Sequence, residues 1–227
     1  MIRYVVADDN VALMKDALRS AGISLTSRVL NIACEFHRVP RYLVDTVSDA
    51  NVNGIEINRS IIEKDPLVRY CNVDEDAFPF EKDTFDLALS VFGVEHFKTD
   101  NVFREAWRTL KPGGTFLFLV PNVCYPAFLS NRILGDRFAN WYYRHVMRER
   151  YQPHKAYYRF NSLGSIRRTS NAVGFRRSHI TFFGPANILL YTRRLPAVRP
   201  VVYLFERLLN NQVLYRFKPY ILVGLEK

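Results

Sequence analysis

Apolar and polar residues follow one another in blocks whose spacing switches between the helical and the extended period. The block 8–22 repeats apolar residues at helical spacing and stops at Gly22, which predicts a helix. The block 28–33 is a short continuous apolar run, typical of a buried strand. By the same criteria further helices are predicted at 38–48 and 59–64, and further strands at 51–57 and 68–71.

The clearest pattern lies in the middle of the chain. A strand is predicted at 85–90, and either Asp100 or Asn101 can cap the amphipathic helix that follows. Lys111-Pro-Gly-Gly114 then places a cation at the negative end of this helix, before residues that cannot prolong it. A β-rich run follows at 115–120. Strands that alternate with helices predict a parallel sheet covered on both faces.

The pattern loosens after residue 120. Residues 121–161 are rich in aromatic and basic side chains with few clean periods, which indicates an excursion over the mouth of the sheet. Regular elements return further along the chain: a helix from Ser162 to Gly174, a strand at 175–183, a helix at 201–210 and a strand at 220–226. A chain of 227 residues suffices for one well-filled core and little more, so we expect a single α/β domain.

The formal net charge of +10 is unevenly distributed. Residues 1–120 hold 14 Lys and Arg against 18 Asp and Glu, whereas residues 121–227 hold 18 against 4. The first half therefore carries −4 and the second +14. A basic half suits an anionic partner, such as a phosphate group, a nucleic acid or an acidic membrane face. The alternative is a solvated basic surface that has no special partner.

Cysteine usage and hydropathy limit the compartment. Cys34, Cys71 and Cys124 are too few and too widely spaced for a disulfide framework or a zinc site, which favours a reducing environment. The most apolar stretch, 186–205, is interrupted by arginines and prolines, and it falls short of the ~20 apolar residues of a membrane helix. Acidic residues come too early for a secretory signal. We expect a cytoplasmic protein, either free or peripheral at a membrane.

Five stretches together resemble one enzyme family: Gly54-Ile-Glu-Ile57, Val73-Asp-Glu-Asp-Ala-Phe-Pro-Phe80, Thr84-Phe-Asp-Leu-Ala-Leu-Ser90, Glu95-His96 and Arg104-Glu-Ala-Trp-Arg-Thr-Leu-Lys-Pro-Gly-Gly114. They are similar to the class I S-adenosylmethionine-dependent methyltransferases, in particular the methyltransferase type 11 group. The resemblance covers roughly 25–120. It implies a Rossmann-like, seven-stranded, mostly parallel sheet with helices on both faces and one antiparallel strand near the C-terminus. In this view 1–227 is a single domain, in which 1–120 is the cofactor-type half and 121–227 the basic aromatic lid and C-terminal strands.

The resemblance also implies where S-adenosylmethionine binds. Glu56, which ends the second strand of the family pattern, would accept hydrogen bonds from the ribose hydroxyls, and Asp74 would contact the adenine amino group. Glu75 and Asp76 stand beside Asp74 and could take the same role. The implied cofactor-binding residues are Asn31, Ala33, Glu35, His37, Glu56, Ile57, Asp74, Glu75 and Ser90. His96 is the candidate catalytic base, and its alternative is a capping or packing role. No metal site is expected, because the Glu35 and His37 pair lacks a third ligand.

The chain departs from the family at the loop after the first strand of the family pattern. Where the family has Asp-x-Gly-x-Gly-x-Gly, this sequence has Asn31, Ala33, Glu35 and His37. Glycines there let the backbone pass close to the cofactor, and a left-handed Glu35 would be strained. The Glu35 carboxylate would also repel the carboxylate of the cofactor, and Arg38 is the nearby cation that could offset this. Three interpretations remain: a remodelled loop that still binds S-adenosylmethionine, a dead site on a binding module, or a pocket with new chemistry.

The basic lid bears on the acceptor. In 132–159 arginines and lysines alternate with tyrosine, phenylalanine and tryptophan. This mixture anchors proteins at membranes, and it also binds nucleic acid by charge neutralisation and base stacking. No RNA-binding motif accompanies it, so nucleic acid is the less favoured partner. We therefore expect a methyltransferase acting on a small, anionic or lipid-linked acceptor. The alternative is an inactive pseudo-methyltransferase that serves as a partner subunit.

Overall fold

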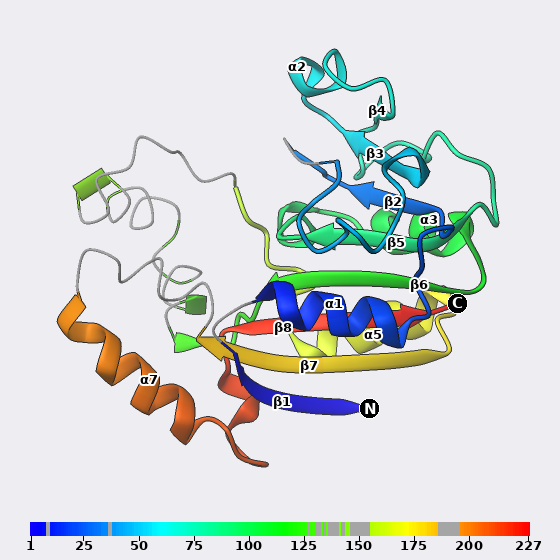
Figure 1. The fold of residues 1–227 in the computed structure, drawn as a ribbon. Coiled ribbons are helices and arrows are strands. Elements are labelled where there is room, and N and C mark those ends of the chain that lie inside the picture. Colours follow the sequence, from blue (N-terminus) through cyan, green and yellow to red (C-terminus); the bar gives the residue numbers. More distant parts are fainter. Residues whose placement is uncertain are drawn as a thin grey trace.

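In the computed structural model, the described residues are 1–7, 10–35, 38–126, 128–129, 133, 135, 141, 144–145, 155–185 and 196–227. Eight strands of this part of the chain form one sheet in the order β1-β7-β8-β6-β5-β2-β3-β4 (Figure 1). The strands are β1 (Ile2–Ala7), β2 (Val29–Ile32), β3 (Val52–Glu56), β4 (Val68–Tyr70), β5 (Phe85–Val91), β6 (Leu110–Pro121), β7 (Arg177–Pro185) and β8 (Tyr220–Glu226). β8 runs antiparallel to both of its neighbours, and the other strand pairs are parallel.

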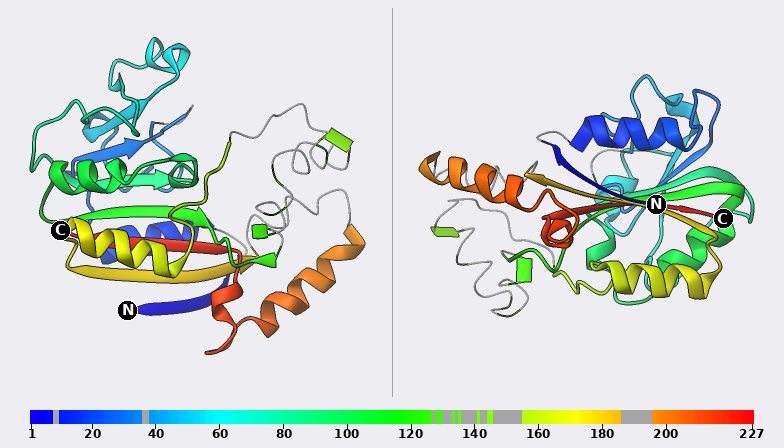
Figure 2. Two further views of the ribbon diagram at one scale, coloured as in Figure 1. Left: turned by 180° about the vertical axis from the view of Figure 1, so that it is seen from behind. Right: turned by 90° about the horizontal axis from the view of Figure 1, so that it is seen from below.

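Helices cover both faces of the sheet. They are α1 (Asn10–Ser20), α2 (Arg59–Ile62), α3 (Asn101–Thr109), α5 (Leu163–Val173) and α7 (Arg199–Leu208), with short 3-10 turns η1 (Asp49–Asn51), η2 (Val94–His96), η4 (Pro196–Val198) and η5 (Tyr215–Phe217). α1 packs on one face, α3 and α5 pack on the other, and α7 lies beyond one end of the sheet (Figure 2). The mostly parallel Rossmann-like sheet predicted from the sequence is confirmed.

The period of two along β6 explains why the sheet has two cores. Phe116 and Phe118 belong to the apolar cluster that also holds Phe103 of α3. Leu117 and Leu119 point to the opposite face and join the cluster that holds Met14 of α1. Because successive side chains of a strand face opposite sides, one continuous apolar strand supplies both layers.

The prediction of seven strands is wrong by one. β1 adds an eighth strand at the edge of the sheet and pairs in parallel with β7, from Ile2 opposite Ile180 to Ala7 opposite Pro185. The N-terminal ammonium group also donates to the carbonyl of Ser178, at 2.8 Å. No element is predicted from the sequence before residue 8, because a short apolar run at a chain end gives no periodic signal of its own.

The helix predicted at 38–48 is also wrong. These residues form turns in which the amide of Val47 donates to the Leu43 carbonyl at 3.0 Å, while Leu43 and Val47 are both buried. Asp45 has a φ of 64°, which is left-handed and cannot belong to an α-helix. The apolar spacing therefore reports burial correctly, although the backbone that achieves it is irregular.

The helix boundaries follow local chemistry where the sequence is explicit. Ser162 caps α5 with a reciprocal capping box to Ser165, and Gly174 ends the helix at a φ of 110°, as predicted. Asp100 precedes α3 without a side-chain cap, because its carboxylate pairs with Arg104 at 3.0 Å. α3 stops at Thr109, and the following residues already belong to β6, which makes this strand longer than predicted. Among the described residues, no helix combines the length and the apolarity needed to cross a membrane.

Candidate active site

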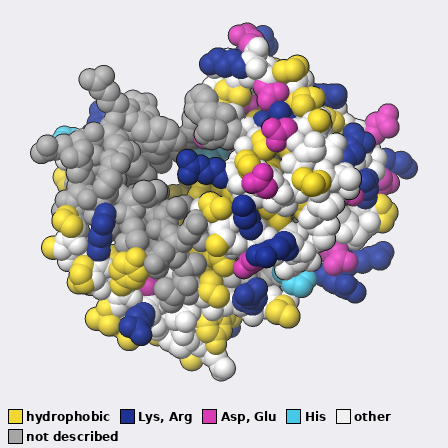
Figure 3. Space-filling view, in the orientation of Figure 1, with side chains coloured by type: hydrophobic (Ala, Val, Ile, Leu, Met, Phe, Trp, Pro, Cys, Tyr) yellow, Lys and Arg dark blue, Asp and Glu magenta, His cyan; other side chains and the backbone are white. Residues whose placement is uncertain are grey.

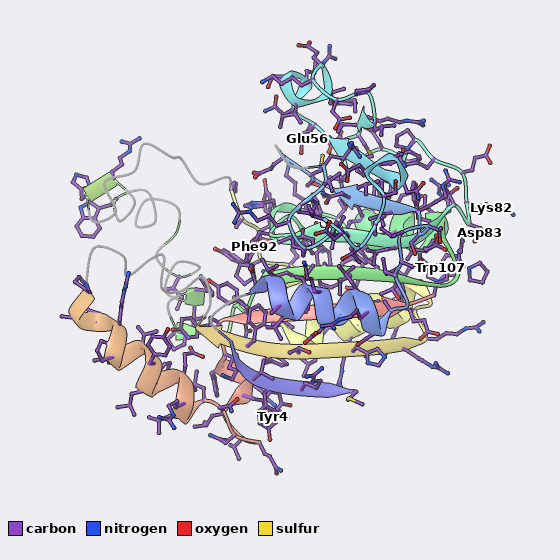
Figure 4. The ribbon with its side chains drawn as sticks, in the orientation of Figure 1. Tyr4, Glu56, Lys82, Asp83, Phe92 and Trp107 are labelled. Atoms are coloured by element: carbon purple, nitrogen blue, oxygen red, sulfur yellow. The ribbon has the colours of Figure 1, made fainter. Side chains whose placement is uncertain are left out.

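The residues singled out in the sequence gather at one edge of the sheet. β2, β3 and β5 are parallel neighbours, so their carboxyl ends meet at this edge. Ala33 follows β2, Glu56 ends β3, and Ser90 and His96 lie at or just after the end of β5. Figure 4 shows Glu56 and Phe92 toward this end, with Lys82, Asp83 and Trp107 at the opposite end. In open α/β sheets this edge is where ligands bind.

The loop after β2 keeps a left-handed backbone even though it has no glycine. Ala33 has a φ of 54° and Glu35 a φ of 45°. A left-handed conformation costs a residue with a Cβ roughly 1–2 kcal/mol. The strain expected for Glu35 is therefore present, and Ala33 shares it. The side chain of Glu35 is exposed, and His37 lies outside the described residues.

A close approach on the other side of this loop depends on Gly93. A Cβ at Gly93 would lie 3.2 Å from the Cβ of Ala33 and 2.7 Å from Oγ of Ser90. The turn after β5 therefore packs directly against the β2 loop, and only glycine fits between them. Ser90 Oγ is buried and makes no hydrogen bond among the described residues. An unpaired buried hydroxyl at the mouth of the site is consistent with a ligand group that completes it.

The carboxylate of Glu56 links the β2 loop to the end of β3 through hydrogen bonds. Its side chain is 7% exposed, and its Oε2 accepts a hydrogen bond from the Glu35 amide at 3.0 Å. Oε1 accepts from the amides of Ile57, at 2.9 Å, and Asn58, at 3.1 Å. These three bonds fill three of the about four acceptor positions of a carboxylate. Glu56 therefore shapes the loop, and at least one acceptor position is available to a ligand hydroxyl.

The guanidinium group of Arg38 makes its hydrogen bonds within the protein. Its Nε donates to Asp65 at 2.6 Å, and its Nη1 donates to the carbonyls of Val52, at 2.6 Å, and Asp49, at 2.8 Å. Burial would raise the pKa of Asp65, but the hydrogen bonds from Arg38 and from the Leu67 amide hold it below its usual range. With these donors used at the entrance to β3, Arg38 supports the strand. It does not act as the counter-charge for Glu35.

Two of the acids after β4 accept hydrogen bonds from neighbouring backbone amides. Asp74 Oδ1 accepts hydrogen bonds from the amides of Lys98, at 2.7 Å, and Thr99, at 2.9 Å. Asp76 Oδ2 accepts from the Asn72 amide at 2.8 Å, while Glu75 is exposed. Asp74 thus ties the turn after β4 to the loop before α3. Its contact with adenine stays a prediction.

His96 is held in one orientation by a backbone carbonyl. Its Nδ1 lies 2.9 Å from the carbonyl oxygen of Lys155, which can only accept, so Nδ1 carries the proton. In the neutral ring the lone pair then belongs to Nε2, the tautomer that a general base needs. The half-buried imidazole sits in η2, directly after β5. Its position is therefore compatible with the catalytic prediction, which stays a prediction.

Glu95 is a residue whose importance the sequence did not reveal. Its side chain is 4% exposed, and Oε2 makes no hydrogen bond among the described residues. Burial raises the pKa of this carboxyl to about 8. The backbone carbonyl of Glu95 accepts from the amides of Tyr157, at 2.8 Å, and Tyr158, at 3.2 Å. An acid between Val94 and Phe97, both buried, was the available signal.

The described end of the predicted excursion, 155–161, does run beside η2. Besides the bonds to Glu95 and His96, the Tyr157 ring contacts two ammonium groups, those of Lys98 at 5.5 Å and Lys155 at 5.2 Å from its centroid. The Val123 amide donates to the Asn161 carbonyl at 2.9 Å. Most of 127–154 lies outside the described residues.

Comparison with known proteins identifies the region that contains this edge. Residues 30–118 match the model of a family described as a methyltransferase domain. Residues 30–118 are therefore similar to a methyltransferase domain. The matched residues run from β2 into β6 and include the β2 loop, Glu56 and η2.

Curated relatives match only part of the chain. A ubiquinone/menaquinone biosynthesis C-methyltransferase of Bartonella henselae is 36% identical over 78 residues, 33% of this chain and 30% of the relative. The mitochondrial 2-methoxy-6-polyprenyl-1,4-benzoquinol methylase of Dictyostelium discoideum is 38% identical over 65 residues, 26% of this chain and 21% of the relative. The matches thus span less than a third of these relatives' lengths.

Solved structures extend the likeness of fold beyond residues 30–118 to nearly the whole chain. An S-adenosylmethionine-dependent methyltransferase from Mesorhizobium loti superposes with a TM-score of 0.58 at 18% identity, over 93% of this chain and 96% of its own. Phosphoethanolamine N-methyltransferase 2 of Haemonchus contortus, solved with S-adenosyl-L-methionine, gives 0.59 at 17% identity over 95% and 52%. At such identities the likeness concerns the fold.

Proposed function

We propose that the protein is an S-adenosylmethionine-dependent methyltransferase that acts on a small acceptor, either anionic or lipid-linked. One observation carries the proposal. The family match falls on the strand edge where a left-handed loop, a buried carboxylate and an oriented imidazole converge.

The residues of this edge fit the cofactor. When bound, S-adenosylmethionine would supply a methyl group activated by its positive sulfonium. Glu56 would hold the ribose, the backbone from Ala33 to Glu35 would border the methionine part, and Ser90 would offer its buried hydroxyl. His96 Nε2 would accept the proton that the acceptor loses as it is methylated. Segment 155–161 would help to exclude water from the site.

The acceptor class is supported by charge and by the relatives. Residues 121–227, which follow the family match, carry +14, and Lys98, Lys155 and Arg159 lie around His96 and Tyr157. The names of the Bartonella and Dictyostelium relatives describe methylation of quinones or of a polyprenyl quinol. Both observations favour an acceptor that is anionic or has a lipid tail.

Calorimetric titration with S-adenosylmethionine and S-adenosylhomocysteine tests the proposal. We expect binding, and Glu56→Gln should weaken it by about 1.5–3 kcal/mol, the value of hydrogen bonds to a charged group. Asp83→Asn, at the far end of the sheet, is the matched control and should leave affinity unchanged. If neither ligand bound at millimolar concentration, the enzyme proposal would be rejected. Equal affinity in the two variants would remove Glu56 from the ribose site.

An inactive partner subunit is the second candidate, and two sets of hydrogen bonds favour it. Backbone amides occupy three acceptor positions of Glu56, and the Nε and Nη1 donors of Arg38 are used within the protein. A loop closed in this way could be stable without a cofactor. The same titration separates the two candidates, because only the enzyme requires binding.

A further inference from the structure

The helix α7 exposes the apolar side chains that a surface helix normally buries. Val201, Leu204 and Leu208 are 64%, 61% and 58% exposed. Their spacing of three and four residues places them on one stripe, and Phe205 extends it. Surface helices of globular proteins turn such a stripe toward the core. In α7 it points outward.

A buried ion pair fixes this orientation. Glu206 and Lys218 are both fully buried, and the Lys218 ammonium lies 3.5 Å from Glu206 Oε2. A Cβ at Gly184 of β7 would lie only 2.5 Å from the same oxygen, so the carboxylate is packed tightly against the sheet. Rotating α7 to bury its leucines would drag Glu206 into water and leave Lys218 buried without a partner. This contact therefore keeps the apolar stripe exposed.

The exposed stripe continues into the neighbouring turns. We call it the α7 surface and define it by Val198, Val201, Leu204, Phe205, Leu208, Val213, Leu214 and Phe217, each at least 37% exposed. Hydrophobic side chains gather at the lower left of Figure 3, where Figure 1 shows α7. Scattered exposed apolar residues are normal, but a contiguous set marks an interaction site.

The charges around the α7 surface are of one sign. Arg199, Arg207 and Arg216 are exposed beside it. From residue 150 to 225 the sequence contains one acid, Glu206, and that side chain is buried. A second copy of this chain would bring the same cations face to face. An apolar stripe bordered by arginines matches instead the interface of a bilayer with negatively charged headgroups.

We propose that the α7 surface docks the protein onto a bilayer that contains acidic phospholipids. The apolar stripe would enter the boundary between headgroups and acyl chains, and the arginines would bind phosphate groups. α7 lies beyond the end of the sheet toward which β2, β3 and β5 point, so docking would bring the candidate active site near the membrane (Figure 1). The proposal does not depend on methyl transfer, because its test reads binding to lipid.

Co-sedimentation with vesicles tests the docking. We expect the protein to bind vesicles of phosphatidylcholine with 30% phosphatidylglycerol and to remain unbound with phosphatidylcholine alone. Leu204→Ser/Leu208→Ser should weaken binding by at least about tenfold, because two apolar anchors are lost. Arg207→Gln should weaken it about fivefold at low salt, and by less at high salt.

Matched controls remove the same chemistry from other surfaces. Leu25 and Val44 are 59% and 44% exposed in the acidic half, and Leu25→Ser/Val44→Ser should bind vesicles like the wild type. Arg167→Gln on α5 controls for net charge. Equal binding to both kinds of vesicle, or an equal loss in the control variants, would overturn the proposal. So would a dimer in sedimentation velocity that Leu204→Ser/Leu208→Ser dissociates, since a second copy would then cover the surface.

Discussion

Two regions of this chain belong to one sheet but differ in the surfaces that they present. The edge formed by β2, β3 and β5 lies within the 30–118 family match, and its polar groups are mostly bound by backbone. The region around α7 lies outside that match, is basic, and exposes apolar side chains. β7 and β8 nonetheless complete the same sheet.

The difference separates the part that is common to the fold from the part that is particular to this chain. The first region lies in a fold that this chain shares with solved methyltransferase structures, and its β2 loop is left-handed although its residues are not glycines. The second region places charge and apolar surface where the fold itself demands neither. Affinity for the cofactor should thus depend on the first region and membrane binding on the second, and variants should be able to separate them.

The largest expected effect comes from breaking the pair that orients α7. Lys218→Met leaves Glu206 buried and unpaired, so the free energy of unfolding should fall by about 3–5 kcal/mol. Urea denaturation measures it. Lys111→Met removes a half-exposed pair with Asp86 and should change stability by less than about 1 kcal/mol. Adding Glu206→Gln to Lys218→Met should restore most of the loss. A fall of less than 1 kcal/mol for Lys218→Met would mean that the pair does not hold the helix.

Glu95, where η2 contacts segment 155–161, should produce a smaller effect that depends on pH. Its pKa is about 8 in the folded protein against an ordinary value of 4.5, so the folded state holds the proton more tightly. This group's stabilisation is complete below pH 4.5 and is lost as pH rises toward 8, by about 1.4 kcal/mol per pH unit.

Glu95→Gln should remove that slope and stabilise the protein by roughly 3 kcal/mol at pH 7. Urea denaturation at intervals between pH 5 and 8 would show it as a divergence between variant and wild type. Glu75→Gln, in an exposed position, is the control and should follow the wild type. Parallel curves for Glu95→Gln and wild type would show that the carboxyl is ionised in the folded state.

Elements whose signals are local were predicted well from the sequence. A continuous apolar run, a capping serine and a terminal glycine each act within a few residues, and β2, β5 and α5 appear where they were expected. The carboxylate that ends β3 was identified through the family resemblance of Gly54-Ile-Glu-Ile57. Its partners could not be predicted, because the amides of Glu35 and Asn58 depend on a loop conformation that the residue types disfavour.

Features that depend on distant contacts were missed. β1 exists because β7, about 175 residues away, offers an edge to pair with. The turn at Asp45 replaces a helix whose apolar spacing was correct. The outward stripe of α7 depends on Lys218 meeting Glu206 through the fold, whereas its amphipathic pattern alone indicates an inward face. In these segments the sequence thus located the apolar residues, but it could not determine the backbone conformation or whether the residues face the core or the solvent.

The smallest expected effect comes from the β2 loop, where a change at Glu35 should alter cofactor affinity and leave membrane binding unchanged. Glu35→Gly frees a residue at a φ of 45° from strain of about 1 kcal/mol, although glycine returns part of this as entropy of the unfolded chain. We expect a net stabilisation of about 0.5 kcal/mol, with tighter binding of S-adenosylmethionine because a carboxylate leaves the loop. Glu35→Ala removes the charge and keeps the strain, so it should improve affinity without the gain in stability.

Calorimetry measures the affinity for the cofactor and urea denaturation measures the stability, and vesicle binding should stay unchanged in both Glu35 variants. If Glu35→Gly bound the cofactor more weakly than wild type, the Glu35 side chain would be a ligand, and the loop would have gained a contact in place of its glycine.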